Sequence, residues 1–190
     1  MIDFSPILRY NKRKGKKNIM KLPDEVVLSA YKDFGLSSNN PWEGTPFEKY
    51  YQTGAKQKGA LGEIIVVSFL ENKGMTVDKP KNQGHDRIIN NYKTEIKFSC
   101  ASKRNKDFLF TFNHISFCKD WERIIFCGIN GDLEAKIVWL SKEDIKKLLD
   151  EGILKHQQAG QENNLDDYCI MGTNSKKLLF HSLAKEMNAF

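Results

Sequence analysis

The stretch that decides the fold of this chain is Gly84-His85-Asp86-Arg87-Ile88-Ile89-Asn90-Asn91-Tyr92-Lys93-Thr94-Glu95-Ile96-Lys97-Phe98. The pair Asn90-Asn91 predicts a tight turn, because Asn tolerates the left-handed backbone angles that such turns require. The stretch is therefore predicted to form two short strands joined by that turn.

The second of these strands alternates between two kinds of side chain. One face is apolar apart from Thr94, and the other face carries the charged residues Glu95 and Lys97. Successive side chains of a strand point to opposite faces, so Glu95 and Lys97 share a face two residues apart. Asp86, at the end of the partner strand, is able to face the same space. Two carboxylates and a lysine at the edge of a sheet can hold a hard cation and polarise a phosphate.

A helix precedes this pair of strands and is expected from about Gly59 to Asn72, with Gly74 ending it. Its side chains are apolar nearly all round, which predicts burial on most sides. Glu63 lies inside this apolar run. A carboxylate held over an apolar face is costly unless a cation pairs with it. The alternative is that Glu63 lies exposed in the first turn and only complements the helix dipole.

The order of a helix with a glutamate, a strand ending in Asp86 and a strand with Glu95-x-Lys97 resembles the core of the PD-(D/E)xK nucleases, a superfamily that includes many restriction endonucleases. His85 stands where the motif name has proline, and the segment 58–63 looks like the first-helix motif of the superfamily. The resemblance implies an α/β fold with a central mixed β-sheet flanked by helices, as in the restriction-endonuclease core.

The resemblance also implies roles for these residues. Asp86 and Glu95 would bind Mg²⁺, or Mn²⁺ as its substitute, and the backbone carbonyl of Ile96 would be a further ligand. Lys97 would contact the scissile phosphate and the attacking water. Glu63 would hold the site from the helix side, through a metal-bound water or a second metal.

The activity implied by the resemblance is Mg²⁺-dependent hydrolysis of double-stranded DNA, leaving 5′-phosphate and 3′-hydroxyl ends. A type II restriction enzyme that acts as a homodimer, with a cognate DNA methyltransferase in the same system, is the leading form of this hypothesis. A Holliday-junction resolvase or repair nuclease of the same fold is the first alternative. A non-catalytic DNA-binding module is an alternative of another class.

The length of the chain is consistent with a single domain, and its charge with binding to a polyanion. The chain has 190 residues, a formal net charge of +6 and a pI near 9.0. This charge favours a nucleic acid as partner. We expect residues 1–57 to form a basic N-terminal arm and helical extension, and residues 58–190 to form the nuclease-like catalytic domain. The extension and the long region after Leu140 favour the restriction enzyme over a resolvase.

Several basic and amide side chains outside the motif are candidates for DNA contact. They are Lys12, Arg13 and Lys14 in the arm, Lys103 and Arg104 after the Glu95 strand, Asn113 and His114 in a Phe-rich segment, and Gln157 and Gln158 in an amide-rich loop. Lysine and arginine neutralise phosphates, and amides read adenine edges. The segment with Asn113 and His114 resembles a stretch of some small restriction endonucleases, which implies proximity to DNA. Each group could instead be an ordinary solvated surface.

The remaining pattern predicts seven further elements. Strands are expected at 75–77, 123–129, 135–140 and 167–172, and helices at 23–34, 141–151 and 175–188 flank them, with Ser141 capping the second of these helices.

Cysteines and hydropathy bear on the compartment. The four cysteines, at 100, 118, 127 and 169, have neither Cys-x-x-Cys nor zinc-ligand spacing, and Cys100 and Cys127 fall in apolar strands. Buried free thiols predict a reducing compartment. No apolar run approaches the length of a membrane span, so we expect no membrane contact and a cytoplasmic location.

Overall fold

The computed structural model describes residues 20–34, 44–80, 82–101, 107–157, 166–187 and 190. The helices are α1 (Asp24–Phe34), α2 (Ala55–Asn72), α3 (Lys142–Asp150) and α4 (Thr173–Leu179), and η1 (Lys49–Gln52) is a short 3-10 helix. The strands are β1 (Met20–Lys21), β2 (Val77–Asp78), β3 (Arg87–Ile89), β4 (Tyr92–Cys100), β5 (Phe110–Ile115), β6 (Arg123–Ile129), β7 (Glu134–Ser141), β8 (Lys155–His156), β9 (Tyr168–Gly172) and β10 (Lys185–Glu186).

Most of these strands form one mixed sheet, in the order β1-β7-β6-β4-β3-β2, with β10 also paired to β7. Strands β4 and β6 run parallel, and the other neighbours are antiparallel. A smaller sheet has the order β5-β9-β8. The predicted α/β class with a central mixed sheet is confirmed at this level.

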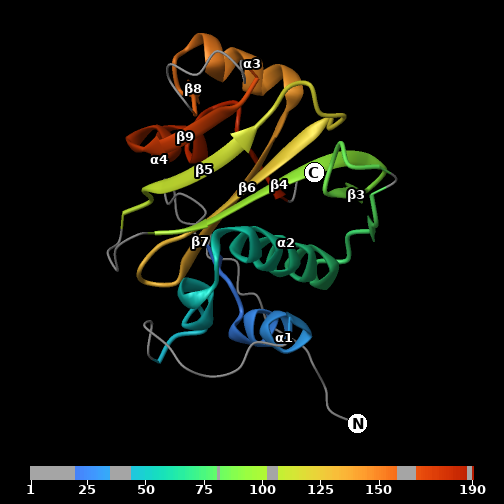
Figure 1. Cartoon of the computed structure of the whole chain (residues 1–190), viewed down its shortest axis with the longest axis vertical. Helices are drawn as coiled ribbons and strands as arrows, with labels where there is room; N and C mark the ends of the chain where they lie inside the picture. Colours follow the sequence, from blue (N-terminus) through green and yellow to red (C-terminus); the bar gives the residue numbers. More distant parts are fainter. Residues whose placement is uncertain (1–19, 35–43, 81, 102–106, 158–165, 188–189) are drawn as a thin grey trace, which may run out of the picture.

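The two faces of the main sheet are covered differently (Figure 1). Helix α2 packs on one face with α1 outside it, and α3, α4 and the smaller sheet lie on the opposite side. Each face has its own hydrophobic core. Along β6, Ile125 and Cys127 belong to the core shared with α1 and α2, whereas Ile124 and Phe126 belong to the core shared with the smaller sheet.

The predicted hairpin is present between β3 and β4. Asn90 and Asn91 both have left-handed backbone angles, with φ of 46° and 70°. Arg87 is directly opposite Thr94, which places Asp86 one residue beyond the start of β3, at the level of Glu95. Local turn chemistry therefore sets the register that brings the two carboxylates together.

Helix α2 begins at Ala55, four residues before the predicted start, so Glu63 lies in its middle and the first-turn alternative is wrong. A Cβ atom on Gly62 would lie 2.5 Å from Cβ of Phe98. The glycine thus permits a close approach between α2 and β4, which carries the adjacent Glu63 to the sheet. The expected boundary between residues 57 and 58 falls within α2, and the described part of 1–57 shares the α2 core.

The predicted terminal helix over 175–188 is wrong in its second half. Helix α4 ends at Leu179, and the chain then forms β10, where Lys185 pairs with Trp139 of β7. Strand β7 has an outer edge whose N–H and C=O groups need partners, and β1 and β10 both pair along it. The need of this edge for partners outweighs the helical pattern of the sequence.

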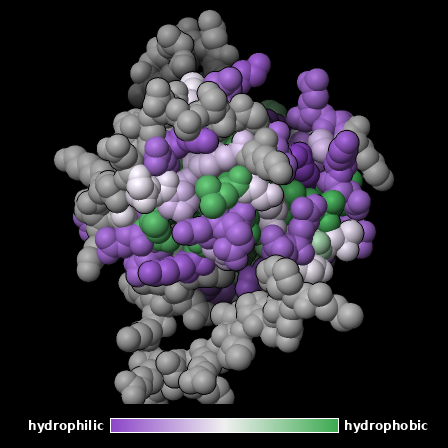
Figure 2. All heavy atoms as spheres, turned by 90° about the horizontal axis from the view of Figure 1, so that it is seen from below, coloured by the Kyte–Doolittle hydropathy of each residue, from purple (hydrophilic) through white to green (hydrophobic). Residues whose placement is uncertain are grey.

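The surface seen in Figure 2 is mostly hydrophilic where it is coloured, with hydrophobic side chains in small patches. Among the described residues, the large hydrophobic side chains that are exposed are Leu28, Tyr92 and Met171, which lie on different elements. No helix in the described ranges combines the length and the apolar character needed to cross a bilayer.

Candidate nuclease-like site

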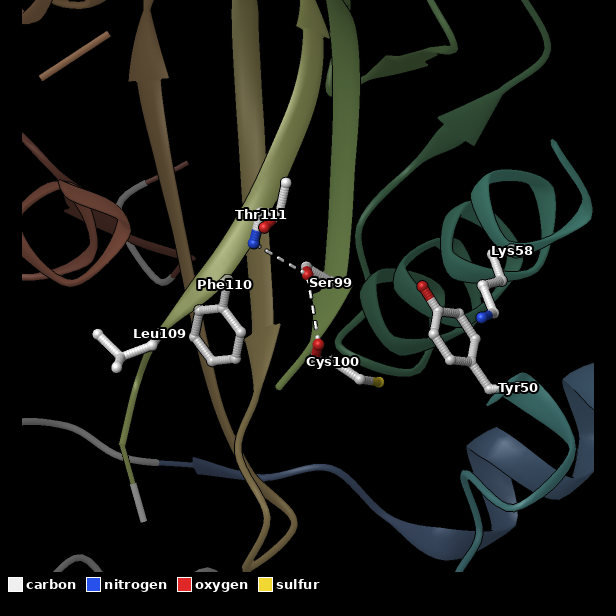
Figure 3. Close-up of a pocket in the computed structure, with 7 residues that line it drawn as sticks. All are labelled: Tyr50, Lys58, Ser99, Cys100, Leu109, Phe110 and Thr111. Carbon is white, nitrogen blue, oxygen red and sulfur yellow. Dashed lines mark hydrogen bonds between the residues drawn. The ribbon is translucent and has the colours of Figure 1, made fainter. Parts of the chain in front are cut away.

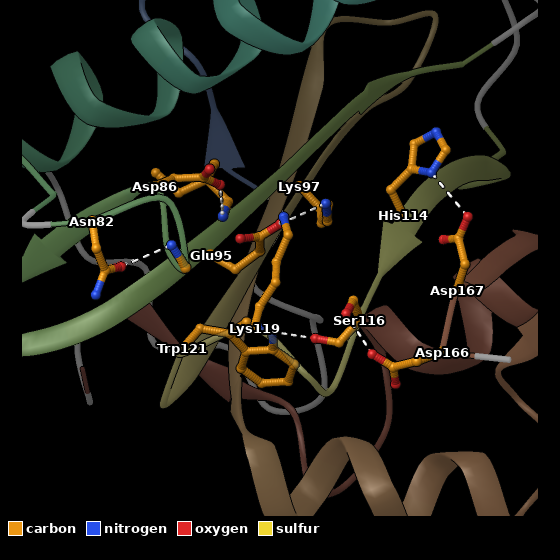
Figure 4. A network of polar contacts seen from close by, with 12 residues as sticks. Asn82, Asp86, Glu95, Lys97, His114, Ser116, Lys119, Trp121, Asp166 and Asp167 are labelled. Carbon is orange, nitrogen blue, oxygen red and sulfur yellow. Dashed lines mark hydrogen bonds and ion pairs between the residues drawn. The ribbon is translucent and has the colours of Figure 1, made fainter. Parts of the chain in front are cut away.

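The structure brings Asp86, Glu95 and Lys97 together at the end of the β3–β4 hairpin (Figure 4). The Oδ2 atom of Asp86 accepts a hydrogen bond of 2.7 Å from the backbone N–H of Ile96. The N–H and C=O of a strand residue point to the same side of the strand. The carbonyl of Ile96, the third expected metal ligand, is therefore directed to the side on which Asp86 lies.

Glu95 is the central group of the site and is 2% exposed. Its Oε1 atom lies 2.8 Å from Nζ of Lys97 and 2.9 Å from Nζ of Lys119. Its Oε2 atom is buried and has no hydrogen-bond partner among the described residues. The polar face predicted for β4 is therefore buried at Glu95, although Lys93 on the same face has a side chain that is 42% exposed. Lys119, in the loop between β5 and β6, contacts Glu95 on this face.

Glu63 reaches the same region from α2 and forms an ion pair with Arg87. The pKa of Glu63 is raised from 4.5 to about 7, first by burial and then by the negative charge of Asp86, against the opposing effect of Arg87. Arg87, the residue after Asp86, is thus the cation that the sequence predicted beside the Glu63 carboxylate. Arg87 also donates to the carbonyl of Asp86 at 2.6 Å.

Electrostatic repulsion links the acids of the site. The pKa of Asp86 is raised by burial and by Glu95, while the Ile96 N–H, Lys97 and Lys119 oppose the shift. A carboxyl group whose pKa is raised by a neighbouring carboxylate, as that of Asp86 is, gains from a cation placed between the two. The site thus contains the carboxylates of Asp86 and Glu95 and the ammonium groups of Lys97 and Lys119.

The oxygen atoms at this site fit a magnesium ion that is completed by water and substrate. Within the described ranges, no group of three or more His, Cys, Asp or Glu side chains is close enough together to hold a metal ion. Mg²⁺ commonly takes only one or two protein carboxylates and completes its octahedron with waters and substrate phosphate. The partnerless Oε2 of Glu95 and the carboxylate of Asp86 fit that pattern. Glu63 is engaged by Arg87 and fits a supporting role better than direct ligation.

His114 and Gln157, two predicted DNA contacts, bind each other. His114 lies in an irregularity of the β5–β9 pairing with φ of 57°. Its backbone N–H donates to Oε1 of Gln157 at 2.8 Å, its Nδ1 lies 3.2 Å from Asp167, and its Nε2 lies 3.3 Å from the Gln157 amide. A carboxylate only accepts and an amide NH₂ only donates, so a neutral ring carries its proton on Nδ1. Gln157 therefore positions His114 in this structure, and contact of either residue with DNA stays a prediction.

The other predicted contacts divide into two groups. Asn113 is described and exposed on β5, next to His114. The positions of Lys12, Arg13, Lys14, Lys103, Arg104 and Gln158 lie outside the described residues. Their contact with DNA stays a prediction.

Two hollows lie near β4, one beside the site and one at the C-terminal end of the strand. One of about 310 Å³ is lined by His114, Ser116, Cys118, Lys119, Asp166 and Asp167, and so adjoins Glu95 through Lys119. The other, of about 260 Å³, lies at the far end of β4 between η1, α2 and β5 (Figure 3). Lys58 projects towards it near the ring of Tyr50. Only the first hollow contains a residue that contacts the paired carboxylates.

Sequence reasoning missed two residues of the site, Arg87 and Lys119. The signal for Arg87 was present: a glutamate in an apolar helix predicts a cation nearby, and Arg87 adjoins the motif aspartate. No local pattern marks Lys119, because it reaches Glu95 from a loop 24 residues later in the chain.

Comparison with known proteins assigns this chain to no family. The sequence matches none of the protein-family models and none of the curated proteins against which it was compared.

Proposed function

We propose that this chain is a Mg²⁺-dependent DNA endonuclease, in its leading form a type II restriction enzyme that acts as a homodimer in the cytoplasm alongside a cognate DNA methyltransferase. The observation that carries the proposal is the buried Glu95, at the level of Asp86. One of its carboxylate oxygens contacts Lys97, and the other has no hydrogen-bond partner within the part of the chain that the structure describes. An ordinary amphipathic strand would present these charges to solvent, whereas Glu95 is 2% exposed.

The residues divide the work of hydrolysis as follows. Asp86, Glu95 and the Ile96 carbonyl would hold Mg²⁺, which supplies Lewis acidity towards a phosphate oxygen and lowers the pKa of a bound water. Lys97 orients the attacking water and stabilises the negative charge that grows on the phosphate. Glu63, through Arg87, fixes the backbone at Asp86. The net charge of +6 would draw the DNA backbone to the protein.

A plasmid digest tests this function. Purified protein is incubated with supercoiled plasmid in Mg²⁺ and, separately, in EDTA, beside the variant Glu95→Gln, which keeps the size of the side chain and removes its charge. We expect discrete fragments with wild-type protein and Mg²⁺ only, with 5′-phosphate ends. Glu95→Gln should lose at least about 10³-fold in rate, in keeping with the loss of a metal site, yet still retain DNA in a gel-shift assay.

Other outcomes of the digest identify the alternatives. Preference for a four-way junction over linear duplex would indicate a resolvase, and DNA retention without cutting under any divalent cation would indicate a binding module. A binding experiment without DNA adds a separate measure: Mg²⁺ or Mn²⁺ should raise the melting temperature of wild-type protein and leave that of Glu95→Gln unchanged.

A further inference from the structure

The residue that the motif does not include, Lys119, makes the same contact as the motif lysine. Both Nζ atoms lie within hydrogen-bond distance of Oε1 of Glu95, at 2.8 Å for Lys97 and 2.9 Å for Lys119. Lys97 is 14% exposed and Lys119 is 37% exposed. Lys119 is therefore the ammonium group that an approaching phosphate can reach more easily.

The loop that carries Lys119 is held by other parts of the chain. The Asp166 carboxylate accepts from the hydroxyl of Ser116 and from the backbone N–H groups of Phe117 and Cys118, at 3.0 Å and 2.8 Å for the two backbone bonds. These donors hold the pKa of Asp166 below its usual value, although burial acts in the opposite direction. An ionised Asp166 thus clamps the three residues that precede Lys119.

Two further hydrogen bonds fix the loop on its other side. The ammonium group of Lys142 donates to the backbone carbonyl of Lys119 at 2.7 Å, and the buried indole of Trp121 donates to the carbonyl of Ser116 at 2.7 Å. Contacts from two other segments, at Asp166 and Lys142, and one hydrogen bond within the loop therefore hold the backbone that carries Lys119. A lysine that served only as a solvated surface charge would not need them.

Charge gives a reason for a second lysine. Asp86, Glu95, Lys97 and Lys119 sum to zero, so a divalent cation would bring the site to +2. The transition state of phosphodiester hydrolysis carries a charge of about −2 on its phosphoryl oxygens, against −1 in the substrate, so a +2 site favours the transition state over the bound substrate. Without Lys119 the sum would be +1.

We propose that Lys119 is a second catalytic lysine, which contacts the phosphodiester and stabilises the charge that develops during cleavage, and that Asp166 is its positioning residue. This proposal rests on the proposed nuclease function. The attacking water forms the new P–O bond and releases a proton to solvent, the P–O3′ bond breaks, and the 3′ oxygen that takes the electron pair receives a proton from solvent. Lys119 keeps its protons throughout and acts by its charge.

The test is single-turnover cleavage of plasmid in Mg²⁺ by wild type, Lys119→Met and Lys119→Arg, with Lys93→Met as the matched control. Lys93 lies on β4, and its ammonium group pairs with the exposed Asp120 at 2.8 Å; its side chain is 42% exposed, close to the value for Lys119. We expect Lys119→Met to lose about 10²–10³-fold in rate, as for removal of one transition-state donor. Its DNA affinity, measured in EDTA, should change by less than about threefold, since one phosphate contact among several is lost.

The variants separate a catalytic role from a structural one. Lys119→Arg, which keeps the charge, should recover most of the rate, and Lys93→Met should cleave within about threefold of wild type. Asp166→Asn should lose about tenfold in rate, because it weakens the clamp without removing the ammonium group. Lys119→Gln replaces Lys119→Met in the comparison should the latter fail to fold, as judged by its circular dichroism.

Failure of this inference and failure of the proposed function give different results. If wild type cleaves, Glu95→Gln does not, and Lys119→Met cleaves within threefold of wild type, Lys119 only neutralises Glu95 and the inference is wrong. If Lys119→Arg is as slow as Lys119→Met, a charge-based role is also wrong. If wild-type protein cuts no DNA with any divalent cation, the nuclease function fails and this inference fails with it.

Discussion

Asp86 and Ile96 are joined by a hydrogen bond of 2.7 Å, in which the backbone N–H of Ile96 donates to the Asp86 carboxylate. The same carboxylate is one of the two that we assign to the metal. A side chain thus completes the main-chain pairing at the end of the β3–β4 hairpin, and one residue serves both the fold and the candidate site.

This relationship predicts different effects for two substitutions of Asp86. Asp86→Asn keeps an oxygen that can accept from Ile96, so the fold should be as stable as wild type while cleavage is lost with the charge. Asp86→Ala leaves a buried N–H without an acceptor and should lower the free energy of unfolding by about 1–3 kcal/mol. Urea denaturation of the three proteins measures the difference, and equal midpoints for the Ala and Asn variants would contradict it.

A second prediction concerns pH and Glu63. Its pKa is raised from 4.5 to about 7 in the folded protein, mainly by burial. A carboxyl whose folded-state pKa is raised favours folding most when it is protonated, below its unfolded pKa. The free energy of unfolding should therefore fall as pH rises from about 4.5 to about 7 and level off above that.

Glu63→Gln should remove this part of the pH dependence. A shift of this size corresponds to roughly 3 kcal/mol, and the 22% exposure of the side chain together with its Arg87 partner reduces the expected change to about 1–2 kcal/mol. Comparing the variant with wild type at about pH 4 and about pH 8 isolates Glu63 from Asp86, whose pKa is also raised. Parallel stability curves for the two proteins would show that the assigned pKa is wrong.

A third prediction uses two glycines of α2 as a matched pair. A Cβ on Gly62 would lie 2.5 Å from Cβ of Phe98, whereas a Cβ on Gly59 would meet nothing within 4 Å. Gly62→Ala should destabilise the protein by about 1–3 kcal/mol, because α2 must move away from β4. Gly59→Ala should stabilise it by about 0.5–1 kcal/mol through the better helix propensity of alanine. Thermal denaturation checks both signs, and a stabilising Gly62→Ala would refute the close packing.

A fourth prediction concerns the backbone at His114, whose φ is 57°. Glycine adopts this conformation without strain and alanine does not. His114→Gly and His114→Ala both lose the contacts of the ring to Asp167 and Gln157, so their difference reports the backbone alone. The Gly variant should be more stable than the Ala variant by about 1 kcal/mol. Equal stability in chemical denaturation would mean that the backbone relaxes there once the ring is removed.

The parts of the fold that could be predicted from the sequence are those set by local chemistry. Asn90-Asn91 forms the turn, Ser141 caps α3 with Asp144 in a reciprocal pair of hydrogen bonds, and the strand at 123–129 is buried after its first residue. In each case the residues that carry the signal are neighbours in the chain. The alternation of β4 likewise placed Glu95 and Lys97 on one face, which the structure confirms.

The features that the sequence did not predict depend on partners that are distant along the chain. The segment 185–186 forms a strand because β7 offers it an open edge, although its own pattern is helical. The cation that pairs with Glu63 is Arg87, which comes from a strand on the other side of a close helix–sheet contact. The contact between Gln157, just after β8, and His114 of β5 likewise depends on how the smaller sheet is assembled, and the DNA contact expected for Gln157 stays a prediction.

By itself, the sequence determined the hairpin, its register and the two acids and lysine that it presents, because turn residues and side-chain alternation act over a few residues. Only the tertiary structure decided that the loop with Lys119 closes over Glu95 and that Asp166 holds this loop. Burial of a carboxylate and the choice of its cations depend on which distant segments pack together, and the spacing of residues along the chain does not encode that packing.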